Sequence, residues 1–164
     1  MTKGYLSLKH IDEWLDIYGE SHKNPINKKI HWVCVPAIMF SVVGLLFLIP
    51  HNNFPMIYGE IQFNWAFLVT AIVITYYFRL SILMALGMTL IGIILITGNY
   101  FIKHFTPFQL WEVSSSLFIL AWVGQFIGHK IEGRKPSFFQ DIQFLLIGPA
   151  WILSFIFKKY NIKY

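Results

Sequence analysis

The chain has 164 residues, of which 56% are hydrophobic and only 13% are charged. Soluble domains are about one quarter charged, so this composition excludes an ordinary soluble protein. The net charge of +5 does not indicate nucleic-acid binding, because the basic residues flank long apolar runs, where membrane topology explains them better. The single cysteine, Cys34, excludes an internal disulfide and metal motifs of the CxxC type. We therefore predict an all-α, polytopic membrane protein.

The N-terminal segment, residues 7–22, has the pattern of an amphipathic helix. Apolar residues recur on one face at helical spacing: Leu8, Ile11, Leu15 and Tyr18. A helix of this kind usually lies along the membrane surface. It lacks the short apolar core and cleavage site of a signal peptide, so we expect none to be removed. Asn24 and Pro25 then predict the start of a second helix, with Asn24 as its N-cap.

Four apolar runs follow, and crossing hydrocarbon takes roughly 20 residues. We predict four transmembrane helices at about residues 30–49, 63–78, 80–97 and 113–127. The short link Arg79–Ser81 makes the second and third of them a tight helical hairpin. Most tryptophans suit the aromatic belt at the membrane surface. They are Trp32, Trp65, Trp111, Trp122 and Trp151.

The last apolar run, residues 142–157, is interrupted by Gly148 and Pro149. It could be a fifth span or a re-entrant segment that returns to its own side. With four spans and a cytoplasmic N-terminus, every Lys and Arg except Lys103 lies inside, and a fifth span would move three lysines outside. The positive-inside rule therefore favours four spans with a re-entrant end. We expect a bacterial inner membrane or an endoplasmic reticulum membrane.

This topology assigns each of the six histidines to one side of the membrane. His51 and His104 fall on the outer side, in loops where solvated side chains are expected. The others fall on the cytoplasmic side: His10, His22, His31 and His129. An imidazole at a membrane boundary is costly to bury unless something binds it, so several converging there suggest a site.

Two helix faces favour a metal centre. His31 shares a face with Asn27 and Cys34, and a second face combines Gln125, His129 and Glu132 at spacings of four and three residues. Neutral imidazoles with a carboxylate or amide suit Zn(II) or non-haem Fe(II). Spacing alone leaves another interpretation open, in which the histidines are hydrogen-bonded boundary residues, Cys34 packs, and Glu132 is a solvated loop charge.

Two blocks of residues resemble a known family. They read Tyr18-x-x-x-His22-x-Asn24-Pro25-x-Asn27-x-x-x-His31-x-x-x-x-Pro36 and Trp122-x-x-Gln125-Phe126-Ile127-Gly128-His129-x-x-Glu132-x-x-x-Pro136. In this order and separation they resemble the small membrane-protein family of the yeast 2-hydroxy fatty acid dioxygenase. The resemblance covers nearly the whole chain, which implies a single membrane-embedded catalytic domain over residues 1–164. Agreement is weak across the second and third spans, so it implies no chain-length preference.

The resemblance implies an Fe(II)-dependent enzyme that uses O2 for α-oxidation and shortens a 2-hydroxy fatty acid by one carbon. The family's essential histidines match His22, His31 and His129, which we expect to be iron ligands. Further family positions match Asn27, Gln125 and Glu132, as supporting residues or additional ligands. The substrate's carboxylate and hydroxyl can chelate the metal and leave a position for O2, and zinc could replace iron adventitiously.

The partners expected for such an enzyme are membrane lipids and the substrate itself, without nucleic acid. Basic residues at the cytoplasmic face would concentrate an anionic headgroup and supply a carboxylate clamp. The candidates are Lys23, Lys28, Lys29, Lys130, Arg134 and Lys135. Two alternatives remain: a haem-binding electron carrier with His31 and His129 as axial ligands, and a non-enzymatic lipid-binding scaffold. The chain has no CxxCH haem-attachment motif, which argues against the first.

Overall fold

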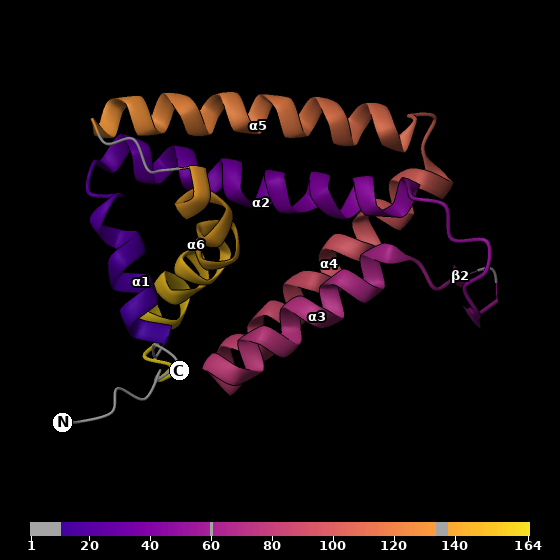
Figure 1. Cartoon of the computed structure of the whole chain (residues 1–164), viewed down its shortest axis with the longest axis horizontal. Coiled ribbons are helices and arrows are strands. Elements are labelled where there is room, and N and C mark those ends of the chain that lie inside the picture. The colour runs from indigo at the N-terminus through magenta and orange to yellow at the C-terminus, as the bar shows by residue number, and fades with distance from the viewer. Residues whose placement is uncertain (1–10, 60, 134–137) are drawn as a thin grey trace.

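The computed structural model describes residues 11–59, 61–133 and 138–164, and within them the fold is helical apart from one short hairpin (Figure 1). The helices are α1 (Ile11–Glu20), α2 (Pro25–Leu48), α3 (Trp65–Leu80), α4 (Ile82–Phe105), α5 (Leu110–Glu132) and α6 (Phe138–Lys159). Between α2 and α3, strands β1 (Met56–Tyr58) and β2 (Ile61–Gln62) pair antiparallel, which the sequence analysis did not anticipate. The predicted helical architecture is confirmed.

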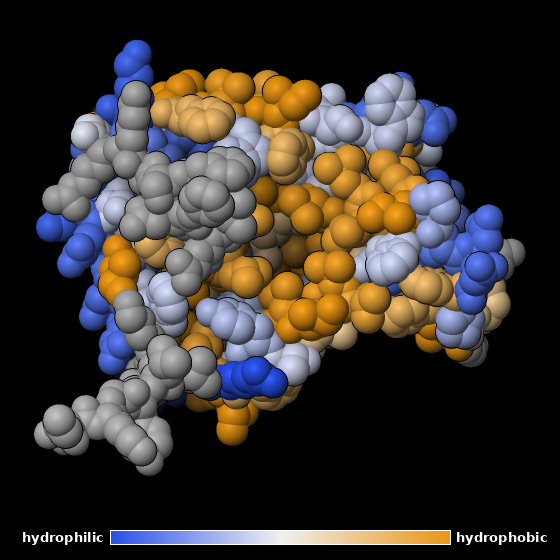
Figure 2. Space-filling model, viewed as in Figure 1, coloured by the Kyte–Doolittle hydropathy of each residue, from blue (hydrophilic) through white to orange (hydrophobic). Residues whose placement is uncertain are grey.

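Within the described residues, three helices are long and apolar enough to cross a membrane, namely α2, α4 and α5. Helix α3 is apolar but has only 16 residues. Helix α4 runs to Phe105, beyond the predicted end near Thr97. Many large apolar side chains on the spanning helices face outward, including Val33, Leu90 and Leu120, which are 70%, 60% and 69% exposed. Hydrophobic residues cover the middle of the molecule and hydrophilic ones gather toward its two ends, as a membrane protein requires (Figure 2).

Helices α2 and α5 lie side by side and antiparallel, and glycines on α5 allow them to approach closely (Figure 1). A side chain at Gly124 would collide with the Cys34 sulfur of α2, and one at Gly128 would collide with the Asn27 amide oxygen. Small residues spaced by four are a common solution for close packing of membrane helices. Cys34 is therefore a packing residue at this interface.

The start of α2 follows the predicted capping pattern. The Asn24 side chain accepts hydrogen bonds from the backbone N–H groups of Ile26, at 2.8 Å, and Asn27, at 3.4 Å, while Pro25 occupies the first turn. The predicted hairpin between α3 and α4 is also present, and Ser81 alone separates the two helices and caps the second. These caps fix the direction in which each helix leaves its turn.

Helix α6 corrects the prediction of a re-entrant hairpin. It continues through Gly148 and Pro149 as a single helix and packs against α1. Pro149 has no N–H to pair with the Leu145 carbonyl four residues earlier, and the adjacent Leu146 carbonyl accepts a hydrogen bond from the Tyr77 hydroxyl of α3. Neighbouring helices can satisfy backbone groups around such a proline, so Gly148–Pro149 does not break the helix.

Helix α1 has the expected amphipathic face. Its buried residues, Ile11, Leu15 and Tyr18, join a core cluster with α6 and the α3–α4 hairpin, while Leu8 lies outside the described residues. Trp151 is 5% exposed and belongs to this core, so its assignment to the interfacial belt is wrong. Packing α1 against α6 fixes the turn that leads into α2.

Candidate metal centre and adjoining cavity

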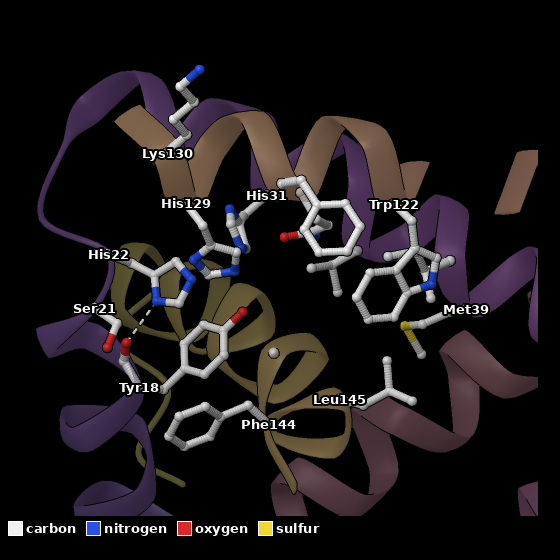
Figure 3. Close-up of a pocket in the computed structure, with 15 residues that line it drawn as sticks. Tyr18, Ser21, His22, His31, Met39, Trp122, His129, Lys130, Phe144 and Leu145 are labelled. Carbon is white, nitrogen blue, oxygen red and sulfur yellow. Dashed lines mark hydrogen bonds between the residues drawn. The ribbon is translucent and has the colours of Figure 1, made fainter. Parts of the chain in front are cut away.

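Three histidines from separate parts of the chain meet where α2 begins and α5 ends (Figure 3). His22 lies in the turn between α1 and α2, His31 lies on α2, and His129 lies near the end of α5. The centroids of the His22 and His31 rings are 4.3 Å apart, and His129 lies 5.0 Å from His31 and 5.6 Å from His22. One ring nitrogen from each residue lies within 4.8 Å of the other two. These three residues could hold a metal ion.

Hydrogen bonds fix the tautomers of two of the rings. The Nδ1 atom of His22 lies 2.7 Å from the Tyr18 carbonyl oxygen, and Nδ1 of His31 lies 3.0 Å from the Asn27 carbonyl oxygen. A carbonyl oxygen only accepts, so each Nδ1 donates and each neutral ring keeps its lone pair on Nε2. In metal-binding histidines, the ring nitrogen that does not bind the metal usually donates a hydrogen bond of this kind, which orients the ring.

The Nε2 atom of His22 is buried and has no hydrogen-bond partner among the described residues. Buried polar atoms are rarely left unpaired, so this lone pair suits a partner that takes it up, either a hydrogen-bond donor or a metal cation. Burial lowers the pKa of His22 to about 4 and outweighs the hydrogen bond to Tyr18, which raises it. His22 is therefore neutral at neutral pH, the form that binds metals.

The spacing of the three rings fits one ion after a small adjustment. Two nitrogens bound to the same ion at about 2.1 Å can lie at most about 4.2 Å apart. The three nitrogens lie within 4.8 Å of one another, so a slight inward rotation of the rings is sufficient. The donor set is imidazole only, which suits iron or zinc better than the hard cations that prefer oxygen ligands.

Glu132 and Asn27 hold this arrangement together from behind the rings. One carboxylate oxygen of Glu132 accepts from the Lys23 N–H at 2.8 Å, and the other accepts from the Asn24 N–H and the Asn27 side-chain amide, each at 3.0 Å. These bonds tie the end of α5 to the turn that carries His22. Glu132 is not among the His, Cys, Asp and Glu side chains that could share the ion, and its hydrogen bonds suit a positioning role. Whether Asn27 supports the site or adds a ligand stays a prediction.

A cavity of about 650 Å³ opens beside the three rings, and we call it the histidine cavity. Its polar end holds the histidines and its other end holds Trp122, Met39 and Leu145 (Figure 3). Gln125, which is 6% exposed, also lines it. A site that is polar at one end and apolar along its length suits a molecule with an acidic head and a hydrocarbon tail.

Comparison with known proteins agrees with this geometry. The family described as "2-hydroxy-palmitic acid dioxygenase Mpo1-like" matches residues 8–160. This chain belongs to the Mpo1-like family. It is 28% identical over 162 residues to the 2-hydroxy-palmitic acid dioxygenase of Saccharomyces cerevisiae, covering 96% of this chain and 84% of that protein. No solved structure matches the chain. The resemblance that the two histidine blocks suggested is confirmed.

The basic residues considered for binding an Mpo1-like substrate are placed unevenly around the cavity. Lys130 lines it, although its side chain points away from the histidines in Figure 3. Lys23 and Lys28 lie before and within the first turn of α2, outside the cavity lining. Arg134 and Lys135 lie outside the described residues. The identity of the carboxylate clamp stays a prediction.

The other histidines lie apart from the cluster, as expected. His51 follows α2 at its far end, where its ring nitrogen lies 2.8 Å from the Ile49 carbonyl oxygen. His104 lies near the end of α4, against the Tyr100 ring. His10 lies outside the described residues. The described part of the chain therefore gathers three histidines at one end and leaves two at the other.

Sequence reasoning missed the aromatic residues that surround His22. The Tyr18 ring stacks on it, with centroids 4.1 Å apart and planes at 12°, and Trp151 lies 5.3 Å away. The spacing of four residues between Tyr18 and His22 was a usable signal for the first contact. No local pattern joins Trp151 to His22, because α6 reaches the site only through tertiary packing.

Proposed function

We propose that this chain is an Fe(II)-dependent dioxygenase that shortens 2-hydroxy fatty acids by one carbon, using O2 in an α-oxidation. The observation that carries the proposal is the cluster of His22, His31 and His129 at the polar end of the histidine cavity. Membership of the Mpo1-like family supports the substrate class, because the yeast relative is named a 2-hydroxy-palmitic acid dioxygenase.

The choice of iron follows from the donors and the reaction class. Zinc would accept the same imidazoles but has no redox chemistry, whereas three protein ligands with open positions for substrate and O2 are typical of non-haem iron oxygenases. Those sites usually have two histidines and a carboxylate, and here a third imidazole would take the place of the carboxylate. Bound ferrous iron would supply the electrons that activate O2. The protein's own contribution is to keep His22 neutral, to orient His22 and His31 through backbone carbonyls, and to bury those two rings.

The substrate's head and tail suit opposite ends of the cavity. A 2-hydroxy acid offers a carboxylate and a hydroxyl to the histidine end, while its chain runs between Val35, Trp122 and Leu145. Lysines near this end, including Lys130, would raise the local concentration of an anionic headgroup. An acyl chain that partitions into lipid can reach such a site without leaving the membrane.

We also propose that the histidine end faces the cytoplasm, with the N-terminus inside, in a bacterial inner membrane or an endoplasmic reticulum membrane. Lys23, Lys28 and Lys29 flank the start of α2 at this end, and Lys130 lies near the end of α5. Lys103 lies near the opposite end, in the last turn of α4. The positive-inside rule favours this orientation.

The test is an oxygen-consumption assay on the purified, detergent-solubilised protein with ferrous iron and 2-hydroxypalmitic acid. We expect O2 uptake that depends on both additions, and a product one carbon shorter by mass spectrometry. His129→Ala should abolish the activity, whereas His51→Ala, at the far end of α2, should leave it unchanged. Absence of turnover in the wild type, or full activity in His129→Ala, would contradict the proposal.

The same preparation separates the two alternative functions. A haem-binding carrier would show a Soret band, but the His31 and His129 rings are only 5.0 Å apart and His22 lies against both, so a porphyrin between them would displace His22. A scaffold would bind no stoichiometric metal even after reconstitution with ferrous iron. A colourless protein that binds one iron agrees with the dioxygenase alone.

A further inference from the structure

A second, smaller cavity lies farther along α2 from the three histidines than the histidine cavity does. Its volume is about 200 Å³, and its walls come from α2, α3, α4 and α6. The lining is almost wholly aliphatic, and Val42, Leu46 and Val69 are typical of it. We call it the distal cavity. Figure 2 shows hydrophobic residues around a hollow near the centre of the visible face.

The two cavities share part of their walls. Ile38, Met39 and Leu145 line both of them. Figure 3 places Met39 and Leu145 at the end of the histidine cavity that is farthest from His22 and His129. These shared residues form the boundary between the cavities, which are therefore consecutive rather than separate.

Helix α2 provides a continuous track along both cavities. From the metal centre inward it contributes His31 and Val35 to the first, Ile38 and Met39 to both, and Val42 to the second. At about 1.5 Å per residue, Val42 lies roughly 16 Å along the helix axis from His31. Along α2 this path begins at the polar cluster and continues past apolar side chains.

We propose that the distal cavity is the binding site for the far end of the substrate's acyl chain, reached through the passage between Met39 and Leu145. This inference rests on the proposed function. The occupant is a long hydrocarbon chain whose head is held at the histidines. Met39 suits the passage because an unbranched thioether side chain can change rotamer at low cost.

Selection by such a cavity is steric. Lipid tails are as apolar as the cavity walls, so moving a methylene group from the bilayer into the protein gains little from the hydrophobic effect. A short chain ends within the histidine cavity and never reaches Val42. A long chain must enter the distal cavity or fold back, so a bulky residue there should penalise long chains alone.

The matched variants are Val42→Phe and Val33→Phe. Both enlarge a valine of α2 by the same amount, but Val42 lines the distal cavity whereas Val33 is 70% exposed and lines neither cavity. Val69→Phe fills the cavity from α3 and serves if Val42→Phe does not yield a monodisperse protein. The ratio of kcat/KM for 2-hydroxypalmitic acid to that for 2-hydroxyoctanoic acid is measured for each variant.

We expect the filled cavity to lower this ratio by about tenfold or more, since misfit by a methylene group already changes specificity by that order. Val33→Phe should keep the wild-type ratio. An unchanged ratio in a folded Val42→Phe or Val69→Phe protein would overturn the proposal and would indicate a structural lipid or packing void. Wild-type protein inactive on both acids would instead refute the proposed function.

A measurement that does not require turnover distinguishes failure of the acyl-chain site from failure of the proposed function. A 2-hydroxypalmitic acid with a diazirine at its methyl end is photolysed on the wild-type protein, and the labelled peptides are mapped by mass spectrometry. Labelling at Val42, Leu46 or Val69 is expected even if no product forms. Labelling confined to outward-facing positions such as Val33 and Leu120 would overturn the acyl-chain site.

Discussion

The two ends of the α2–α5 pair are built from similar parts but differ in what their polar groups do. At the histidine end, Gly128 lets the Asn27 side chain approach α5, and at the far end Gly44 of α2 accommodates Asn99 and Ser114. Both Asn27 and Asn99 are fully buried. Close helix approach over a glycine and a buried amide are therefore not sufficient to indicate a functional site.

The difference lies in where the polar atoms point. Asn99 donates to the carbonyl oxygens of Phe40 at 3.1 Å and Leu95 at 2.9 Å, so its amide joins two helices, and it lines neither described cavity. At the histidine end, backbone carbonyls occupy Nδ1 of His22 and His31, while the rings line a large cavity. The Asn99 Oδ1 atom is also buried without a partner among the described residues, so an unpaired buried atom alone does not indicate a site. The unpaired Nε2 of His22 differs because its ring lines the histidine cavity, where a ligand can reach it.

Removing a ring from the cluster should have the largest effect. We expect His31→Ala to lower the affinity for ferrous iron by more than about 100-fold, because loss of a direct ligand should exceed the 10–100-fold typical of outer-shell changes. His104→Ala, at the far end, should bind iron normally. Metal stoichiometry by mass spectrometry checks both, and a full complement of iron in His31→Ala would remove the distinction between the two ends.

Changing Glu132, which supports the histidines through hydrogen bonds, should have the next largest effect on iron affinity. In Glu132→Gln an amide NH2 replaces one acceptor oxygen and faces donors from Lys23, Asn24 and Asn27. We expect iron affinity to fall by about 10–100-fold with the helical circular dichroism unchanged. The matched control is Glu112→Gln, an exposed position in the first turn of α5. Equal affinities in the two variants would show that Glu132 does not position the site.

A pair of glycine variants separates packing from function. Gly128→Ala and Gly44→Ala each place a methyl group against buried polar atoms, and each should lower the free energy of unfolding by about 1–3 kcal/mol. Only Gly128→Ala should also weaken iron binding in the folded fraction, because it displaces Asn27 from Glu132. Detergent-denaturation curves combined with iron titration distinguish the effects. Weakened binding in Gly44→Ala as well would show that the two ends are coupled.

Local patterns predicted much of the fold. The Asn24 cap, the apolar face of α1 and the hairpin at Ser81 all depend on neighbouring residues, and all three are confirmed. The convergence of His22, His31 and His129 was predictable because charge counting placed them at one membrane face. The role of Glu132 as an anchor for the α1–α2 turn was not, since its partners lie more than 100 residues away in sequence.

The failures share a physical cause. Gly148–Pro149 is a break signal in isolation, yet α6 continues through it because packing with α1 and α3 supports the helix there. Trp151 has the composition of a belt residue, and tertiary packing makes it part of the core. The β1–β2 hairpin is too short for an alternating pattern to predict it. Sequence periodicity describes what one element prefers, and these features depend on which elements it meets.

The smallest effect should come from changing Asn99, at the end of α2 that is far from the histidines. Asn99→Leu keeps the approximate size of the side chain but removes the hydrogen bonds to the Phe40 and Leu95 carbonyls. Hydrogen bonds between membrane helices contribute about 0.6 kcal/mol on average, because the unfolded chain in the membrane also finds partners. We therefore expect a loss of about that size in unfolding experiments, with unchanged iron affinity. A loss of iron comparable to that of Glu132→Gln would mean that Asn99 supports the metal centre through the length of α2, and that α2 transmits the position of one end to the other.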